Sequence, residues 1–190
     1  MQISPSEHDK RELLRIARKT ISKGCEGFPP ELEAQDAEQS DFFKHQGACF
    51  VTLQKQGNLR GCIGSTQAHR ALLDDVVQNA FASAFRDPRF PPVTENELTE
   101  ISVEISILTP QEQMQIDDEK DLLKQLRPGT DGLLIRNADY SATFLPQVWK
   151  QLPNPRQFLA HLKNKAGMSP GLWPKDMECF RYQCIKFEEA

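Results

Sequence analysis

Hydrophobic residues follow two different spacings along this chain, and each spacing predicts a kind of element. Apolar residues recur every three to four positions in 12–21 and again in 72–85, which is typical of helices that bury one side. Strict alternation in 101–107 places isoleucine and valine on one face of a strand and polar residues, Glu104 among them, on the other. The chain therefore contains both helices and strands with a buried side.

Turn residues divide the rest of the chain into shorter elements. The sequences at 56–58 and 137–139 each join two strand-like segments, which predicts two β-hairpins. Two further helices and one final strand are predicted at 118–126, 157–165 and 180–188. Strands from distant parts of the chain, with few helices, predict an α+β domain in which helices flank an antiparallel sheet.

Composition restricts the class of protein. A chain of 190 residues can bury one core, or one core with a smaller lobe beside it. The net charge of −4 argues against nucleic acid as the partner, because phosphate contacts need a basic surface. No apolar run is long enough to cross a membrane, and no signal-peptide pattern opens the chain, so we expect a cytoplasmic protein.

The cysteines and histidines indicate neither a disulfide framework nor a metal site. The five cysteines form no C-x-x-C pair and are odd in number, which favours reduced thiols. The four histidines are scattered and show no zinc-ligand spacing, so no metal is expected. Three cysteines in apolar strand contexts are predicted to be core residues: Cys49, Cys179 and Cys184.

The segment "NLRGCIGS" (58–65) is the strongest candidate site. On a regular strand, Arg60 and Cys62 share a face about 7 Å apart, while Leu59 and Ile63 face the core. A cation beside a thiol favours the nucleophilic thiolate, and a strand glycine often marks a bulge or a close approach. The segment could therefore present an activated cysteine in a shallow notch, where Gly64 leaves room.

Structural alternatives remain open for each candidate. Cys62 could be a small buried hydrophobe, and a bulge at Gly61 would reverse its orientation. Glu104 could pair with Arg60, act as an acid or base, or be solvated. His69 could be a base, although a solvated surface position is favoured.

The motif "RDPRFPP" (86–92) has two interpretations of its own. Asp87 and Arg89 could form a capped turn or bind an anion, and the turn comes first because helix termination explains the prolines.

Several separated motifs carry a family resemblance. "LRGCIGS", "RDPRFPP", "VEISIL", "FLPQV" and "KAG" occur in this order, and the chain from about residue 11 to residue 187 resembles the AMMECR-one domain family. The resemblance implies one family domain over 1–190, with a larger sheet lobe and a smaller lobe. The segment Arg60–Gly64 is then expected to border the cleft between the lobes, within 59–65.

The resemblance also implies partners. Family members are similar to component A of the AmmeMemoRadiSam system, which pairs the family with a Memo-like protein and a radical S-adenosylmethionine (SAM) enzyme. It supplies no reaction and no cofactor, and fold analogy cannot supply one. Members often carry a cysteine before "KAG" where this chain has Lys163, which weakens any scheme that needs a second cysteine.

Two functional hypotheses follow. In the first, the protein is a component of a modification system in which Cys62 is the reactive thiol, with Arg60 and Glu104 as catalytic partners. The expected substrate-binding residues are Gly61, Gly64, Ser65, Asp87 and Arg89. In the second, the protein is a non-catalytic module that docks the same partners through the Arg60–Gly64 groove.

Overall fold

The protein has an α+β fold with antiparallel sheets, as the sequence predicts. The structure is a computed structural model that describes residues 4–33, 36 and 40–189. The chain divides into two compact units, one comprising Met1–Leu108 with Ile185–Ala190 and the other Thr109–Cys184.

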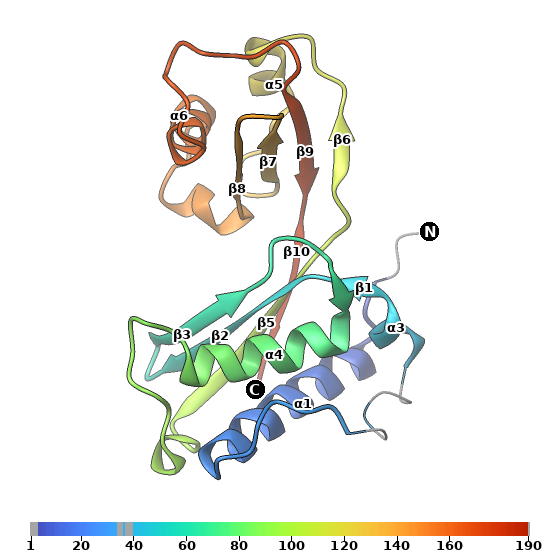
Figure 1. Ribbon diagram of the computed structural model, residues 1–190, viewed down its shortest axis with the longest axis vertical. Helices are drawn as coiled ribbons and strands as arrows, with labels where there is room; N and C mark the ends of the chain where they lie inside the picture. The colour runs from blue at the N-terminus through green and yellow to red at the C-terminus, as the bar shows by residue number, and fades with distance from the viewer. Residues whose placement is uncertain (1–3, 34–35, 37–39, 190) are drawn as a thin grey trace. The chain divides into compact units, whose positions relative to one another are not determined.

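A four-stranded sheet in the order β10-β5-β2-β3 forms the centre of the first unit (Figure 1). Strand β2 pairs antiparallel with both β3 and β5, so the predicted first hairpin is confirmed. Strand β3 forms one edge of the sheet. The strands are β2 (Cys49–Lys55), β3 (Asn58–Gly64), β5 (Ile101–Leu108) and β10 (Cys184–Glu188), and a separate short pair joins β1 (Gln46–Gly47) to β4 (Arg70–Ala71).

Two helices cover one face of this sheet, α1 (Glu7–Cys25) and α4 (Leu72–Phe85) (Figure 1). Their apolar stripes pack on the residues of β2 and β5 that face them, which include Val51, Leu53 and Ile105, all fully buried. Ser6 and Asp9 form a capping box at the start of α1, which satisfies backbone groups that the first turn leaves unpaired. The short elements α3 (Asp41–Lys44) and η1 (Glu95–Glu97) complete the unit.

The second unit packs two helices on another antiparallel sheet, of order β6-β9-β7-β8. Trp149 stacks on Phe158 with ring centroids 3.8 Å apart at the centre of its core. The pairing of β7 with β8 confirms the second hairpin. The elements are β6 (Glu112–Met114), α5 (Glu119–Gln125), β7 (Gly132–Arg136), β8 (Ser141–Phe144), η2 (Pro146–Lys150), α6 (Pro155–Lys165) and β9 (Glu178–Tyr182).

The single final strand predicted over 180–188 is wrong. Two strands occupy this segment, β9 and β10, and they belong to different sheets. Gln183 separates them. Its backbone N–H donates to Thr109 Oγ1, and its carbonyl accepts from the Thr109 N–H, each at 2.8 Å. Because both strands are apolar and β-prone, their hydrophobic pattern contains no sign of the break.

Helix α4 approaches β3 so closely at Gly61 that a side chain would not fit. A Cβ atom on Gly61 would lie 2.1 Å from the Ser83 carbonyl oxygen of α4. This glycine is therefore explained by helix–sheet packing, because the obstructing atom belongs to a helix backbone and cannot rotate away.

We expect Gly61→Ala to lower the free energy of unfolding by about 1–3 kcal/mol, the usual cost of forcing extra volume into a packed core. Gly171→Ala is the matched control, since a Cβ there would meet nothing within 4 Å. Urea unfolding of the two variants measures the difference. Equal stability of both variants would contradict the packing assigned to Gly61.

Candidate functional site

A β-bulge at Arg60 determines which way each residue of β3 faces. Leu53 of β2 lies opposite Gly61, and the next residue, Gln54, lies opposite Leu59, so Arg60 is the extra residue. Such a bulge breaks the alternation of side chains along the strand. Leu59 is consequently 44% exposed, and its predicted place in the core is wrong.

Beyond the bulge, Cys62 occupies the sheet face that helices α1 and α4 do not cover. Its neighbours Gly61 and Ile63 pair with Leu53 and Val51 of the buried face, whereas Cys62 pairs with Thr52. The sequence predicted this outward orientation of Cys62. Cys62 and Arg60 were predicted to share one face of the strand. This prediction is wrong, because Arg60 is itself the extra residue of the bulge.

Arg60 is held by η1 rather than by the thiol. Its Nε and Nη2 each donate to a carboxylate oxygen of Glu97 at 3.0 Å, and Nη2 also lies 3.4 Å from the Pro92 carbonyl. Arg60 is 8% exposed, and its Nη1 is buried without a hydrogen-bond partner among the described residues. Within the described part of the chain its guanidinium makes no bond to Cys62 or Glu104, so of the alternatives left open for Glu104 the ion pair with Arg60 is not formed.

This ion pair lowers the pKa of the Glu97 carboxyl to about 2, mainly through the hydrogen bonds from Arg60. Lys55 contributes a longer contact, 3.3 Å from its Nζ to Glu97 Oε1. Glu97 was missed in the sequence because η1 lies in a polar stretch without periodicity.

Asp87 and Arg89 bind both backbone groups of Cys62. The Cys62 N–H donates to Asp87 Oδ2 at 2.9 Å, and Arg89 Nη2 donates to the Cys62 carbonyl at 3.2 Å. Arg89 also holds Asp87 with bonds of 2.9 and 2.7 Å, and its guanidinium lowers the pKa of the Asp87 carboxyl well below its usual range. We call these two residues the edge clamp, because they replace a neighbouring strand at the free edge of β3.

The sheet face opposite helices α1 and α4 carries a row of polar side chains that starts at Cys62. Thr52 Oγ1 donates to Cys62 Sγ at 3.3 Å, and Thr52 pairs in register with Glu104 of β5. Glu104 Oε2 accepts from Lys186 Nζ of β10 at 2.7 Å and from Gln54 Nε2 at 3.2 Å. We call Cys62, Thr52, Glu104 and Lys186 the polar row.

Two members of the polar row, Thr52 and Lys186, were missed in the sequence. Alternation alone could place each residue on a face of its own strand, but only the strand order brings β3, β2, β5 and β10 side by side. Glu104 is only 8% exposed, so it is a buried carboxylate. The ammonium of Lys186 compensates its charge.

Gly64 and Ser65 have structural contacts instead of an open notch. A Cβ on Gly64 would lie 2.3 Å from the Phe50 ring, so the space predicted there is filled. Ser65 Oγ donates to Asp75 Oδ1 at 2.7 Å. Asp75 is fully buried and also accepts from the Cys49 N–H and from Arg70 Nε, both at 2.8 Å.

The remaining cysteines differ from one another in burial. Cys49 and Cys179 are fully buried, as predicted, whereas Cys184 is half-buried, so its predicted place in the core is wrong. Burial raises the pKa of the Cys179 thiol to about 12 and that of Cys184 to about 11. His69 is exposed and its ring contacts the carbonyl of Gln67, in line with the favoured surface position.

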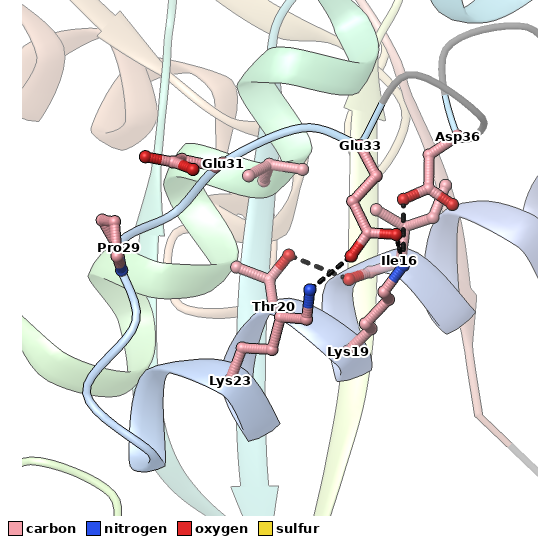
Figure 2. Close-up of a pocket in the computed structure, with 9 residues that line it drawn as sticks. Ile16, Lys19, Thr20, Lys23, Pro29, Glu31, Glu33 and Asp36 are labelled. Atoms are coloured by element: carbon pink, nitrogen blue, oxygen red, sulfur yellow. Dashed lines mark hydrogen bonds and ion pairs between the residues drawn. The ribbon is translucent and has the colours of Figure 1, made fainter.

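The charged side chains that line a hollow beside α1 pair with one another (Figure 2). Lys19 and Lys23 both bind Glu33, and Lys19 Nζ also lies 3.4 Å from Asp36 Oδ2. These contacts lower the pKa of Glu33 to about 2, with the hydrogen bond from Lys19 as the largest cause. The volume of about 10 Å³ is that of roughly one water, so this hollow is a structural ion-pair cluster.

Two features are absent from the described ranges 4–33, 36 and 40–189. No three His, Cys, Asp or Glu side chains there are grouped to hold a metal ion. No helix within these ranges combines the length and hydropathy needed to cross a bilayer.

Comparison with known proteins confirms the family resemblance. The AMMECR1 family model matches residues 14–187, and the chain belongs to this family. A protein of Methanothermobacter thermautotrophicus is 35% identical over 192 residues, which cover 100% of this chain and 99% of that protein. Protein Mbar_A1807 of Methanosarcina barkeri is 38% identical over 183 residues, 94% of this chain and 90% of the relative.

A solved structure shares the fold. The crystal structure of uncharacterized protein PH0010 from Pyrococcus horikoshii matches with a TM-score of 0.79 and 31% identity. The match covers 95% of this chain and 91% of that chain. The α+β architecture is thus common to both proteins.

We expect Glu97→Gln to destabilise the protein more at neutral pH than in acid. The folded pKa of about 2 lies below the ordinary 4.5, so the ion pair stabilises fully above pH 4.5 and is lost as pH falls toward 2. Urea unfolding of both proteins at about pH 6 and about pH 3 measures the difference between them.

The control is Glu100→Gln, which removes an ion pair between Lys55 and a 45% exposed carboxylate and should cost little at any pH. A stability difference for Glu97→Gln that is the same at both pH values would contradict the assigned ion pair.

Proposed function

We propose that this protein is a component of a modification system in which Cys62 is the reactive thiol, acting with a Memo-like protein and a radical SAM enzyme. The observation that carries the proposal is the polar row. A thiol, a hydroxyl, a carboxylate and an ammonium follow one another across four strands, on the sheet face opposite the helices.

The edge clamp supports the proposal because it fixes the position of the thiol. Asp87 and Arg89 hold the backbone N–H and carbonyl of Cys62, and the Thr52 hydroxyl contacts its Sγ. A reactive group works best when its own rotamer and backbone are held by neighbouring hydrogen bonds. Asp87 and Arg89 act in this account as positioning residues rather than as substrate ligands.

The roles of the other candidates change accordingly. Cys62 is the reactive group, and the Glu104–Lys186 pair supplies a carboxylate and an ammonium on the same face for proton transfer or charge stabilisation. Arg60 supports the bulge that turns Leu59 to solvent, since its guanidinium is occupied by Glu97. Gly61 allows α4 to approach β3.

A second candidate, a non-catalytic module that docks these partners through the Arg60–Gly64 segment, is favoured by one specific observation. Arg60, Gly61, Gly64, Asp87 and Arg89 all have internal contacts that explain them without a substrate. Leu59, 44% exposed on the edge strand, would then supply an apolar contact for the partner.

Cys62→Ala should abolish the product of the system without weakening partner binding. The product is the species that comparative mass spectrometry finds only when all three genes are present. Isothermal titration calorimetry with the Memo-like protein and with the radical SAM enzyme measures binding. Cys25→Ala is the control because Cys25 is a half-buried thiol of the same unit.

The two candidate functions predict different results for this experiment. Retention of product by Cys62→Ala would contradict the reactive-thiol proposal. If in addition Leu59→Asp abolished partner binding, the docking module would be the correct description.

A further inference from the structure

The second unit contains a cavity lined by positive charge. Its volume is about 420 Å³, within the range of about 300–1,000 Å³ typical of small-molecule sites. It lies between α5 and the start of α6 and is lined by Lys120, Leu123, Lys124, Asn154, Pro155 and Arg156.

Three cations converge on this cavity without an internal counterion. Lys120 and Lys124 are one turn apart on α5, and Arg156 comes from the first turn of α6. No hydrogen bond or ion pair joins these three side chains to any other described residue. Like charges at i and i+4 of a helix repel each other, so the arrangement lowers stability unless an anion neutralises it.

None of the neighbouring acidic residues that the structure describes forms an ion pair with these cations. Glu119 accepts from Lys163 Nζ at 2.6 Å. Asp121 accepts from the Asp117 N–H and from Gln125 Nε2, and Asp118 accepts from the Asp121 N–H. The cations of the cavity are therefore not paired with a carboxylate of their own helix.

The hollow beside α1 shows what a self-neutralised cluster looks like in the same protein. There Lys19 and Lys23 bind Glu33, and the remaining volume is about 10 Å³ (Figure 2). The cavity of the second unit differs on both counts, since it is open and its cations are unpaired.

Two features narrow the chemistry of the ligand. The half-buried side chains of Leu123 and Pro155 give the cavity an apolar portion beside the cations. The Asn154 side chain already accepts from the N–H groups of Arg156 and Gln157, so the α6 N-terminus is capped and the side chains must hold the anion. A ligand that fits carries one anionic group next to a small apolar body.

We propose that this cavity binds a small organic anion, either a phosphate monoester or a carboxylate. Its charged group contacts Lys120, Lys124 and Arg156, and its apolar part lies on Leu123 and Pro155. The site is separate from the polar row, and its test does not depend on the reactivity of Cys62.

Titrations of the ¹⁵N-labelled full chain, followed by amide chemical shifts, test the proposal. The probes are phenyl phosphate, benzoate, inorganic phosphate and the neutral benzyl alcohol. We expect saturable shifts in α5 and in 154–157 with phenyl phosphate or benzoate, weaker binding of inorganic phosphate, and none of benzyl alcohol. The stronger of the two aromatic anions identifies the anionic group.

Lys124→Gln and Arg156→Gln should each weaken binding about tenfold, the loss of one charge-assisted hydrogen bond. Lys175→Gln is the matched control, because Lys175 is an exposed cation of the same unit that lines no part of this cavity. Absence of saturation at millimolar probe, equal binding of benzyl alcohol, or an equal loss in Lys175→Gln would overturn the proposal.

Discussion

The edge clamp on Cys62 is the contact on which the local structure of the candidate site depends. Strand β3 ends the sheet, and an edge strand exposes backbone groups that require partners. Asp87 and Arg89 supply both partners at Cys62 from the turn that follows α4. The "RDPRFPP" motif thus ends a helix and completes a sheet edge at the same time.

The bulge at Arg60 and the clamp at Cys62 act on the same short segment. The bulge turns Leu59 to solvent and allows Arg60 to reach Glu97. The clamp then holds the strand with Cys62 on the sheet face opposite α1 and α4. The two glycines of the motif fit this geometry, since a Cβ at either position would collide with Ser83 or Phe50. The unusual composition of "LRGCIGS" is therefore largely structural, and Cys62 is the member that structure alone does not account for.

Much of the fold could be predicted from the sequence because it depends on local periodicity and turn chemistry. The stripe of α4, the alternation of β5 and the turn at Gly57 each identify their element without tertiary information. The division of 180–188 at Gln183 could not be predicted, since both halves have the same pattern and only their sheets differ. The candidate site shows the same limit. Cys62 was found from its motif, whereas Lys186 joins the polar row only through the order of the strands. Arg60 binds Glu97 and not Glu104, because a bulge redirects its guanidinium.

Residue-resolved alkylation of the native protein by iodoacetamide, followed by mass spectrometry, tests the central claim that Cys62 is a positioned and reactive thiol. The other four cysteines are internal references: burial raises the pKa values of Cys25, Cys49, Cys179 and Cys184. The account predicts that Cys62 is alkylated in the folded protein well before these four. Alkylation of Cys62 only on unfolding, together with the buried Cys49, would contradict it.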